Sequence, residues 1–288
     1  MFMPHNSPWP ADWPCTILKI ADSSCAILHY GAHIVSCKLN ASEEIFWLSP
    51  LSDFQSGKPI RGGNPLCWPN FGTNPNFPDL PKHGIARLLM WEKTHEEQNA
   101  TQAKAVFSLS DTAMQSYQIP PGINLRFTVT LGADTLKTDL EVFNQGTAAF
   151  EFTESQHAYF SISDINNITV HGLQNSSYLD RAANTRETNT ENEFCVRKPS
   201  DLIFLHHQGE ISIVDPGKNR RICVNKQNAG GVVVWNPYQA MPPEVTDMSA
   251  QAFRHFICVE PANAQQTAVT VPAGSGSRLS MEINVKEI

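Results

Sequence analysis

Apolar and polar residues alternate with a period of two along much of the chain, and this pattern predicts β-strands. Residues 125–131 place Leu, Phe, Val and Leu between Arg and Thr, and residues 279–285 repeat the same alternation with Leu, Met, Ile and Val. A strand exposes alternate side chains on opposite faces, so each segment is expected to cover a core with one face. The run Gly132-Ala133-Asp134 predicts a turn between two such strands.

Shorter segments rich in β-branched and aromatic residues each predict a further strand: residues 17–20, 26–30, 35–39, 45–48, 105–109, 140–142, 150–153, 168–170, 211–214, 222–224, 232–235, 257–259 and 268–271. Only residues 111–117 and 247–256 favour short helices. So many strands, joined by segments rich in proline and glycine, predict an all-β sandwich. We expect one domain over residues 1–288, because no linker-like segment divides the chain.

Two segments depart from the strand pattern. Residues 57–87 form a long stretch rich in Gly, Pro and Asn that also contains Trp68, Phe71 and Phe77. A long irregular loop with aromatic residues of the buried type is typical of a functional loop. The polar residues 184–193 predict an exposed loop.

The composition excludes several classes of protein. The formal net charge is −7 and no cluster of Lys and Arg occurs, so we expect no nucleic-acid partner. The sequence has no run of 18 apolar residues, so we expect no membrane-spanning helix. Residues 1–14 lack the basic and apolar regions of a secretory signal, and we expect a cytoplasmic protein.

Metal and cofactor motifs are missing from the sequence. The seven cysteines form no CxxC pair, and the adjacent His206 and His207 have no further ligands at metal-binding spacing. Phosphate-binding loops, HExxH and GxSxG motifs and a dinucleotide fingerprint are not found either. We therefore expect neither a metal nor a cofactor.

Two residues are candidates for acid–base chemistry. Glu260 follows the apolar residues 256–259 and precedes Pro261, which predicts a partly shielded carboxylate at a strand end. Burial would raise its pKa toward the range of a general base; the alternative is a glutamate that faces water. An unperturbed imidazole titrates near neutrality, so His157 could act as an acid, although a core histidine bound to a backbone carbonyl is the alternative interpretation.

The long loop supplies further candidates. His83 precedes a glycine that permits close backbone approach, and Arg61 and Arg87 offer forked donors that match phosphate or carboxylate oxygens. Each could instead be a solvated surface residue. Four aromatic residues could stack on a sugar or pack in the core: Trp68, Phe71, Phe160 and Trp235.

Taken together, these segments resemble the hexose-6-phosphate 1-epimerase (glucose-6-phosphate mutarotase) family of the galactose-mutarotase superfamily. The resemblance runs in the family's order from residue 57 to residue 261 and rests on these segments: Gly57–Gly63 with Cys67–Pro69 and Phe71–Gly72; Pro81–Arg87 with Trp91; His157–Phe160; Ser200–Asp201; Val234–Pro237; and Asp247–Met248 leading to Cys258–Pro261.

The resemblance implies a β-supersandwich enzyme with a catalytic pair. Glu260 would take the proton from the anomeric hydroxyl while His157 protonates the ring oxygen. The ring would open to the aldehyde, the C1–C2 bond would rotate, and closure would produce the other anomer. No cofactor takes part in this reaction.

The resemblance also implies a set of substrate-binding residues. His83 and Asp201 would hold sugar hydroxyls or assist the acid, and Arg61 and Arg87 would bind the 6-phosphate. Leu202 stands where the family often has an arginine after the aspartate. Lys58, Lys82 and Arg254 are the candidates to replace that charge.

Three alternatives remain open from the sequence. The chain could be a mutarotase of unphosphorylated aldoses, a catalytically silent carbohydrate-binding module, or a purely structural β-sandwich. The joint presence of His157 and Glu260 favours an enzyme, since a binding module does not need a matched acid and base. We expect a monomer whose partner is a small sugar phosphate.

Overall fold

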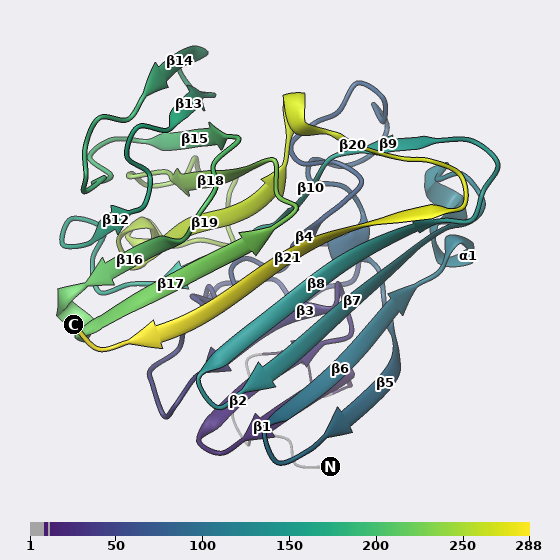
Figure 1. Cartoon of the computed structure of the whole chain (residues 1–288), viewed down its shortest axis with the longest axis horizontal. Coiled ribbons are helices and arrows are strands. Elements are labelled where there is room, and N and C mark those ends of the chain that lie inside the picture. Colours follow the sequence, from purple (N-terminus) through teal and green to yellow (C-terminus); the bar gives the residue numbers. More distant parts are fainter. Residues whose placement is uncertain (1–8, 11) are drawn as a thin grey trace.

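The computed structural model describes residues 9, 10 and 12–288, and two eight-stranded sheets dominate it (Figure 1). The first sheet contains, in spatial order, β12 (Thr169–His171), β16 (Ile211–Asp215), β17 (Arg220–Gln227), β21 (Ser275–Lys286), β8 (Thr135–Asn144), β7 (Ile123–Gly132), β6 (Gln102–Leu109) and β5 (Glu92–Gln98). All of its neighbouring strands are antiparallel.

The second sheet has the order β14 (Thr185–Thr188), β13 (Ser177–Asp180), β15 (Ser200–Leu205), β18 (Gly231–Asn236), β19 (Phe256–Asn263), β10 (Glu154–Gln156) and β4 (Leu66–Cys67), and β11 (Tyr159–Ser161) also pairs with β19. In Figure 1 the strands β13, β14, β15 and β18 of the second sheet lie at the upper left, beside the first sheet. Two small sheets complete the fold: β1 (Cys15–Ile20), β2 (Ser23–Leu28) and β3 (His33–Lys38) form one, and β9 (Phe150–Phe152) and β20 (Val269–Val271) form the other.

The core forms where the alternating segments turn one face inward. In β8 every second residue is buried, and Leu140 lies opposite Phe127 of β7 in the sheet register. Both side chains are fully enclosed. Burial of a side chain of this size contributes about 1.5–3 kcal/mol to folding. The all-β sandwich expected from the period-two pattern is confirmed.

Several local expectations were wrong. Residues 45–48 form only isolated bridges, such as Phe46 with Phe160, rather than a strand. The expected loops at 184–193 and 57–87 contain β14 and β4 respectively. Strand β5 was missed because its sequence Glu-Lys-Thr-His-Glu-Glu-Gln holds no apolar residue, and all of it is exposed at the sheet edge. Charged side chains on such an edge prevent pairing with other molecules.

The helices are short, as the sequence indicates. α1 (Asp111–Met114) is capped by the Ser110 side chain and continues as the 3-10 helix η2 (Gln115–Tyr117). The other described helices are 3-10 turns: η1 (Ala86–Leu88), η3 (Pro216–Lys218), η4 (Ala252–His255) and η5 (Gln265–Thr267). Among the described residues no helix has the length and apolar character needed to cross a membrane.

Strand β19 has one face in the core and the other toward a pocket. Ile257 and Val259 belong to the main hydrophobic core, whereas Cys258 and Glu260, which alternate with them, project from the opposite face. The face that carries Glu260 borders a pocket. The period-two geometry of one strand thus separates the residues of the core from those of the pocket.

Candidate active site

A cavity of about 250 Å³ contains all of the candidate site residues: Arg61, His83, Arg87, His157, Asp201 and Glu260. They come from β19, β15, the segment before β11 and the long loop around β4. The antiparallel pairing of β19 with β18, β10 and β11 brings these distant parts of the chain to one place.

Glu260 lies inside β19 and is fully buried, so the expectation of a partly shielded strand end was wrong. The Ser155 hydroxyl of the neighbouring β10 donates a hydrogen bond to Glu260 Oε2 over 3.2 Å. Burial, and then the negative charge of Asp201, raise the pKa of Glu260 well above its usual range. A glutamate that faces water is thereby excluded.

His157 occupies the connection between β10 and β11 and is almost completely buried. Its ring stacks on Tyr159 with a centroid distance of 4.8 Å, and its Nδ1 atom lies 3.2 Å from Glu260 Oε1. Burial, together with the positive charges of Arg87 and Arg61, lowers the pKa of His157 well below its usual value. In the described structure Nδ1 makes no hydrogen bond, so the interpretation of a core histidine satisfied by a carbonyl does not apply to that atom.

The environments of the two residues shift their pKa values in opposite directions. Burial favours the neutral form of each, which is a protonated carboxyl for Glu260 and an uncharged imidazole for His157. A pair of titratable groups whose pKa values are displaced in this way is typical of acid–base sites.

His83 takes a left-handed backbone conformation with φ of 67°. Gly84 follows, and a Cβ atom there would lie 2.1 Å from the Trp68 carbonyl oxygen, so only glycine fits. The backbone N–H of Gly72 donates to His83 Nδ1 over 3.2 Å. Burial, and then the charge of His157, lower the pKa of His83. The neutral ring that results has its proton on Nε2, which remains available as a donor.

The two arginines differ in their partners. Arg61 Nε donates to Asp247 Oδ2 over 3.1 Å, and its Nη1 donates to the Tyr159 hydroxyl over 3.3 Å. Arg87 Nη2 donates to the Lys82 carbonyl oxygen over 2.8 Å, while its enclosed Nε has no hydrogen-bond partner in the described structure. Both guanidinium groups therefore keep donors that are not used within the protein.

Arg181 was missed in the sequence. It follows β13 directly, and its backbone N–H donates to the Asp201 carbonyl oxygen over 2.9 Å. Its Nη1 atom lies 3.7 Å from Asp201 Oδ1, and its guanidinium lies over the Phe71 ring at 5.8 Å. The sequence around Asp180-Arg181 contains no motif that would indicate a binding residue. Only the pairing of β13 with β15 places it beside Asp201.

Lys58, Lys82 and Arg254 are the candidates to replace the charge that is missing at Leu202. Lys82 lines the pocket. Lys58 instead pairs with Asp53 at the surface, and Arg254 pairs with Asp164; neither lines the pocket. Lys82 and Arg181 are therefore the additional cations at the site.

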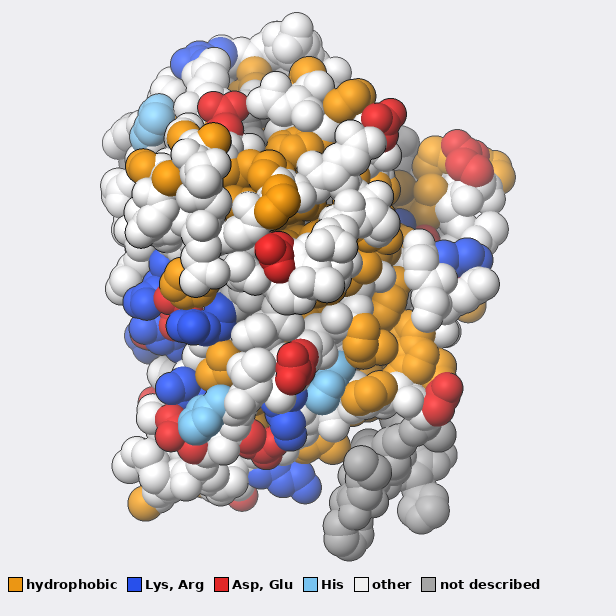
Figure 2. All heavy atoms as spheres, turned by 90° about the vertical axis from the view of Figure 1, so that its right-hand side faces the viewer, with side chains coloured by type: hydrophobic (Ala, Val, Ile, Leu, Met, Phe, Trp, Pro, Cys, Tyr) orange, Lys and Arg blue, Asp and Glu red, His pale blue; other side chains and the backbone are white. Residues whose placement is uncertain are grey.

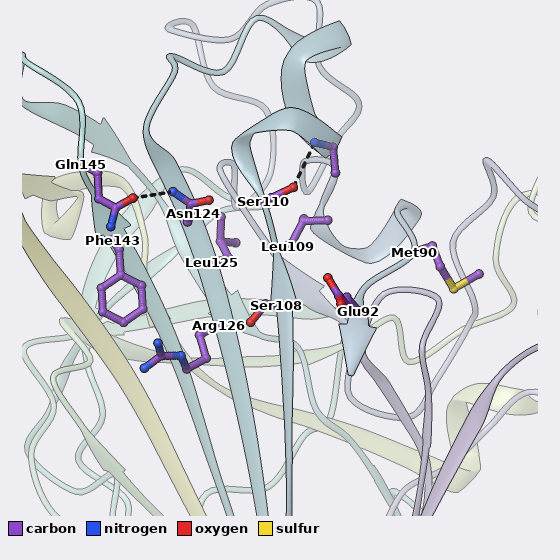
Figure 3. A pocket seen from close by; sticks show the side chains of 11 residues that line it. Met90, Glu92, Ser108, Leu109, Ser110, Asn124, Leu125, Arg126, Phe143 and Gln145 are labelled. Atoms are coloured by element: carbon purple, nitrogen blue, oxygen red, sulfur yellow. Dashed lines mark hydrogen bonds between the residues drawn. The ribbon is translucent and has the colours of Figure 1, made fainter. Parts of the chain in front are cut away.

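A larger hollow, of about 580 Å³, lies on the face near α1 and β5. Figure 2 shows apolar side chains on that face among acidic and basic ones. Figure 3 shows Arg126 beside Phe143, with the guanidinium 4.7 Å from the ring centre, and Asn124 donating to Gln145. The described residues around this hollow include Glu92 but no histidine, so it has no counterpart of the His157 and Glu260 pair in the smaller pocket.

A second buried carboxyl, Glu154, lies beside the site on β10. Asn263 Nδ2 donates to its Oε1 over 2.9 Å, while Oε2 has no partner among the described residues. Burial raises the pKa of Glu154 from 4.5 to about 7. The unfolded chain releases the Glu154 proton at a lower pH than the folded protein does. The free energy of unfolding therefore falls as the pH rises from 4.5 toward 7.

We expect Glu154→Gln to remove that loss of stability. The difference between the two pKa values corresponds to about 3 kcal/mol at most, so the variant should gain stability over the parent between acidic and mildly alkaline pH. Denaturant unfolding across that range measures the effect. Glu282→Gln on the exposed face of β21 is the control. Parallel stability curves for Glu154→Gln and the parent would contradict the assignment.

Fold and pocket together define a sugar epimerase of the galactose-mutarotase-like β-sandwich class. The chain belongs to the aldose 1-epimerase family, whose model matches residues 15–284.

Individual relatives agree with this assignment. A protein of Escherichia coli (strain K12) named "Putative glucose-6-phosphate 1-epimerase" is 33% identical over 238 residues, covering 82% of this chain and 79% of its own. A protein of Cenchrus ciliaris with the same name is 29% identical over 273 residues, covering 91% and 82%. A crystal structure from Salmonella typhimurium described as "a putative mutarotase" superposes with a TM-score of 0.87 at 28% identity, covering 97% of this chain and 92% of its own.

Proposed function

We propose that the protein is a hexose-6-phosphate 1-epimerase that interconverts the α and β anomers of its substrate. The observation that carries the proposal is the enclosed pair of His157 and Glu260, whose Nδ1 and Oε1 atoms lie 3.2 Å apart. Arg61 and Arg87 line the same pocket. The names of the relatives support the same reaction and a phosphorylated substrate.

The reaction moves one proton from the anomeric oxygen and delivers one to the ring oxygen. In the reactive form the proton of the pair lies on His157, and Glu260 is charged. Glu260 then accepts the proton of the anomeric hydroxyl, and His157 donates its proton to the ring oxygen as the C1–O5 bond breaks. Rotation about C1–C2 exposes the other face of the aldehyde, and the reverse proton movements close the ring. A positioned acid or base contributes roughly 10²–10⁴-fold to such a step.

The positive charge of the pocket favours a phosphorylated sugar over a neutral one. Arg61, Lys82, Arg87 and Arg181 all line the cavity, whereas its carboxylates are Asp201 and Glu260. Asp201 is partly balanced by Arg181 at 3.7 Å. A phosphate dianion would supply the missing negative charge and accept the unused guanidinium donors. A mutarotase of free aldoses has no such need.

We also propose that the protein acts as a single domain over residues 1–288 and as a monomer in the cytoplasm, without a nucleic-acid partner. One hydrophobic core cluster joins strands of both large sheets and of the three-stranded sheet, from Leu18 to Ile283, which supports one domain. Seven free cysteines fit a reducing compartment. The acidic net charge of −7 disfavours nucleic acid.

The dependence of kcat/KM on pH is expected to be bell-shaped around neutrality. As the pH falls, Glu260 gains a proton through its raised pKa and can no longer act as a base. As the pH rises, His157, whose pKa is lowered, loses the proton that it donates. Initial rates corrected for spontaneous anomerisation measure the profile. A rate independent of pH would contradict the paired roles.

Exchange between anomers, followed by NMR on glucose 6-phosphate and in parallel on glucose, tests the proposed function. Enhanced exchange on the phosphate ester alone is the expected result. Enhancement on glucose alone would keep the acid–base pair but reject the phosphate site. No enhancement on either sugar would favour the carbohydrate-binding module.

A further inference from the structure

Three side chains that commonly bind metals meet at the wall of the pocket: His157, Cys258 and Glu260. One ligand atom from each lies within 4.8 Å of the other two, and all three residues are buried. Cys258 and Glu260 are two positions apart on β19 and therefore project from the same face. Tyr159 of β11 pairs with Cys258, and this pairing brings His157 alongside.

Two of the donor atoms are enclosed and have no hydrogen-bond partner among the described residues: His157 Nδ1 and Glu260 Oε1. They lie 3.2 Å apart. A tetrahedral zinc ion with bonds of about 2.0–2.2 Å holds its nitrogen and oxygen ligands roughly 3.3 Å apart. Buried polar atoms without hydrogen bonds require an explanation. In the metal-free protein the proton of the acid–base pair lies between the two atoms, and a bound cation would satisfy both at the same spacing.

We propose that His157, Cys258 and Glu260 form a binding site for a borderline-soft divalent cation such as Zn²⁺, and that the bound metal blocks the reaction by occupying the acid and the base. The combination of imidazole nitrogen, thiolate sulfur and carboxylate oxygen is one that Zn²⁺ and Co²⁺ accept. On binding, the Cys258 thiol and the Glu260 carboxyl each release a proton to solvent. The fourth position of the metal remains open to water.

The surroundings make this a site of reversible inhibition. Arg61 and Arg87 line the same pocket and repel a cation, so binding is weaker than at a structural zinc site. The sequence expectation of no metal rested on the missing ligands around His206 and His207, and it did not consider Cys258 together with the catalytic pair. The blocking effect rests on the proposed function, whereas the binding of the metal does not.

Binding is tested first, without reference to activity. The full chain is freed of metal with a chelator, dialysed and titrated with Co²⁺, whose thiolate complexes absorb in the near ultraviolet. We expect a charge-transfer band that saturates at one equivalent. Cys258→Ser should abolish the band, and Cys223→Ser, a matched buried cysteine on β17, should retain it. A band that persists in Cys258→Ser, or no band in the parent, would overturn the proposal.

Inhibition is tested next with Zn²⁺. The anomerisation rate of the parent should fall at least about tenfold on addition of Zn²⁺ and recover with chelator. For Cys258→Ser, the Zn²⁺ concentration that halves its own metal-free rate should be at least about tenfold higher than for the parent. Equal inhibition of both proteins would overturn the blocking role. A Co²⁺ band in a protein that enhances exchange on neither sugar would support the metal site and reject the proposed function. If Cys258→Ser fails to fold by circular dichroism, His157→Gln must abolish the band instead.

Discussion

Replacing Glu260 with glutamine lowers the anomerisation rate by roughly 10²–10⁴-fold. The amide keeps the shape of the side chain and can still accept the hydrogen bond that Ser155 donates to Oε2. It cannot accept the proton of the anomeric hydroxyl. NMR exchange rates on glucose 6-phosphate, corrected for the spontaneous reaction, measure the loss. We expect KM to change much less than kcat.

The fold should tolerate this change. The pKa of Glu260 is raised because burial disfavours its charge, so a neutral amide suits the site at least as well. Thermal unfolding of Glu260→Gln should match or exceed that of the parent, and Glu282→Gln should leave the rate unchanged. A Glu260→Gln variant that keeps its rate would make the base assignment wrong and direct attention to Asp201, the other carboxylate of the pocket.

Arg61→Ala has the second large effect, a loss of selectivity for the phosphorylated sugar. A hydrogen bond to a charged group contributes about 1.5–3 kcal/mol, so kcat/KM for glucose 6-phosphate should fall roughly 10–150-fold. Any rate on glucose should stay the same. Phosphate would also offset the positive charges that lower the pKa of His157, which favours the protonated acid in the bound state.

The controls separate the phosphate site from damage to the pocket. Arg61 also pairs with Asp247, so its removal leaves a half-buried carboxylate, and the double variant with Asp247→Asn removes that charge. Arg254→Ala deletes an arginine outside the pocket and should be silent in the assay. An equal loss on both sugars would indicate a collapsed pocket, and an unchanged rate on glucose 6-phosphate would refute the role of Arg61.

The strand pattern was predictable where one face of a strand is buried. Segments such as β7 and β8 alternate because the core selects apolar residues at every second position. β5 and β14 have no buried face, so their sequences carry no such signal. β5 pairs with β6, and β14 pairs with β13. These partners are close in sequence, but the composition of β5 and β14 does not show that the pairing occurs.

The types of residue in the site were also evident from the sequence. An imidazole, a carboxylate and two guanidinium groups, in segments that follow the order of a family this chain resembles, predicted acid–base chemistry on an anionic substrate. What the sequence left open was whether each residue faced the pocket, the core or water. Arg181 shows the difficulty, because it joins the site only through the register of β13 against β15.

By itself, then, the sequence determined the class of fold and the chemical groups available, since both depend on local pattern and residue type. Only the tertiary structure decided the protonation of those groups. The pKa values of His157 and Glu260 depend on burial and on charges that lie far away in the chain, such as Arg87 and Asp201. It also decided that Cys258 lies beside them, because antiparallel pairing, rather than sequence distance, sets which side chains share one face of a sheet.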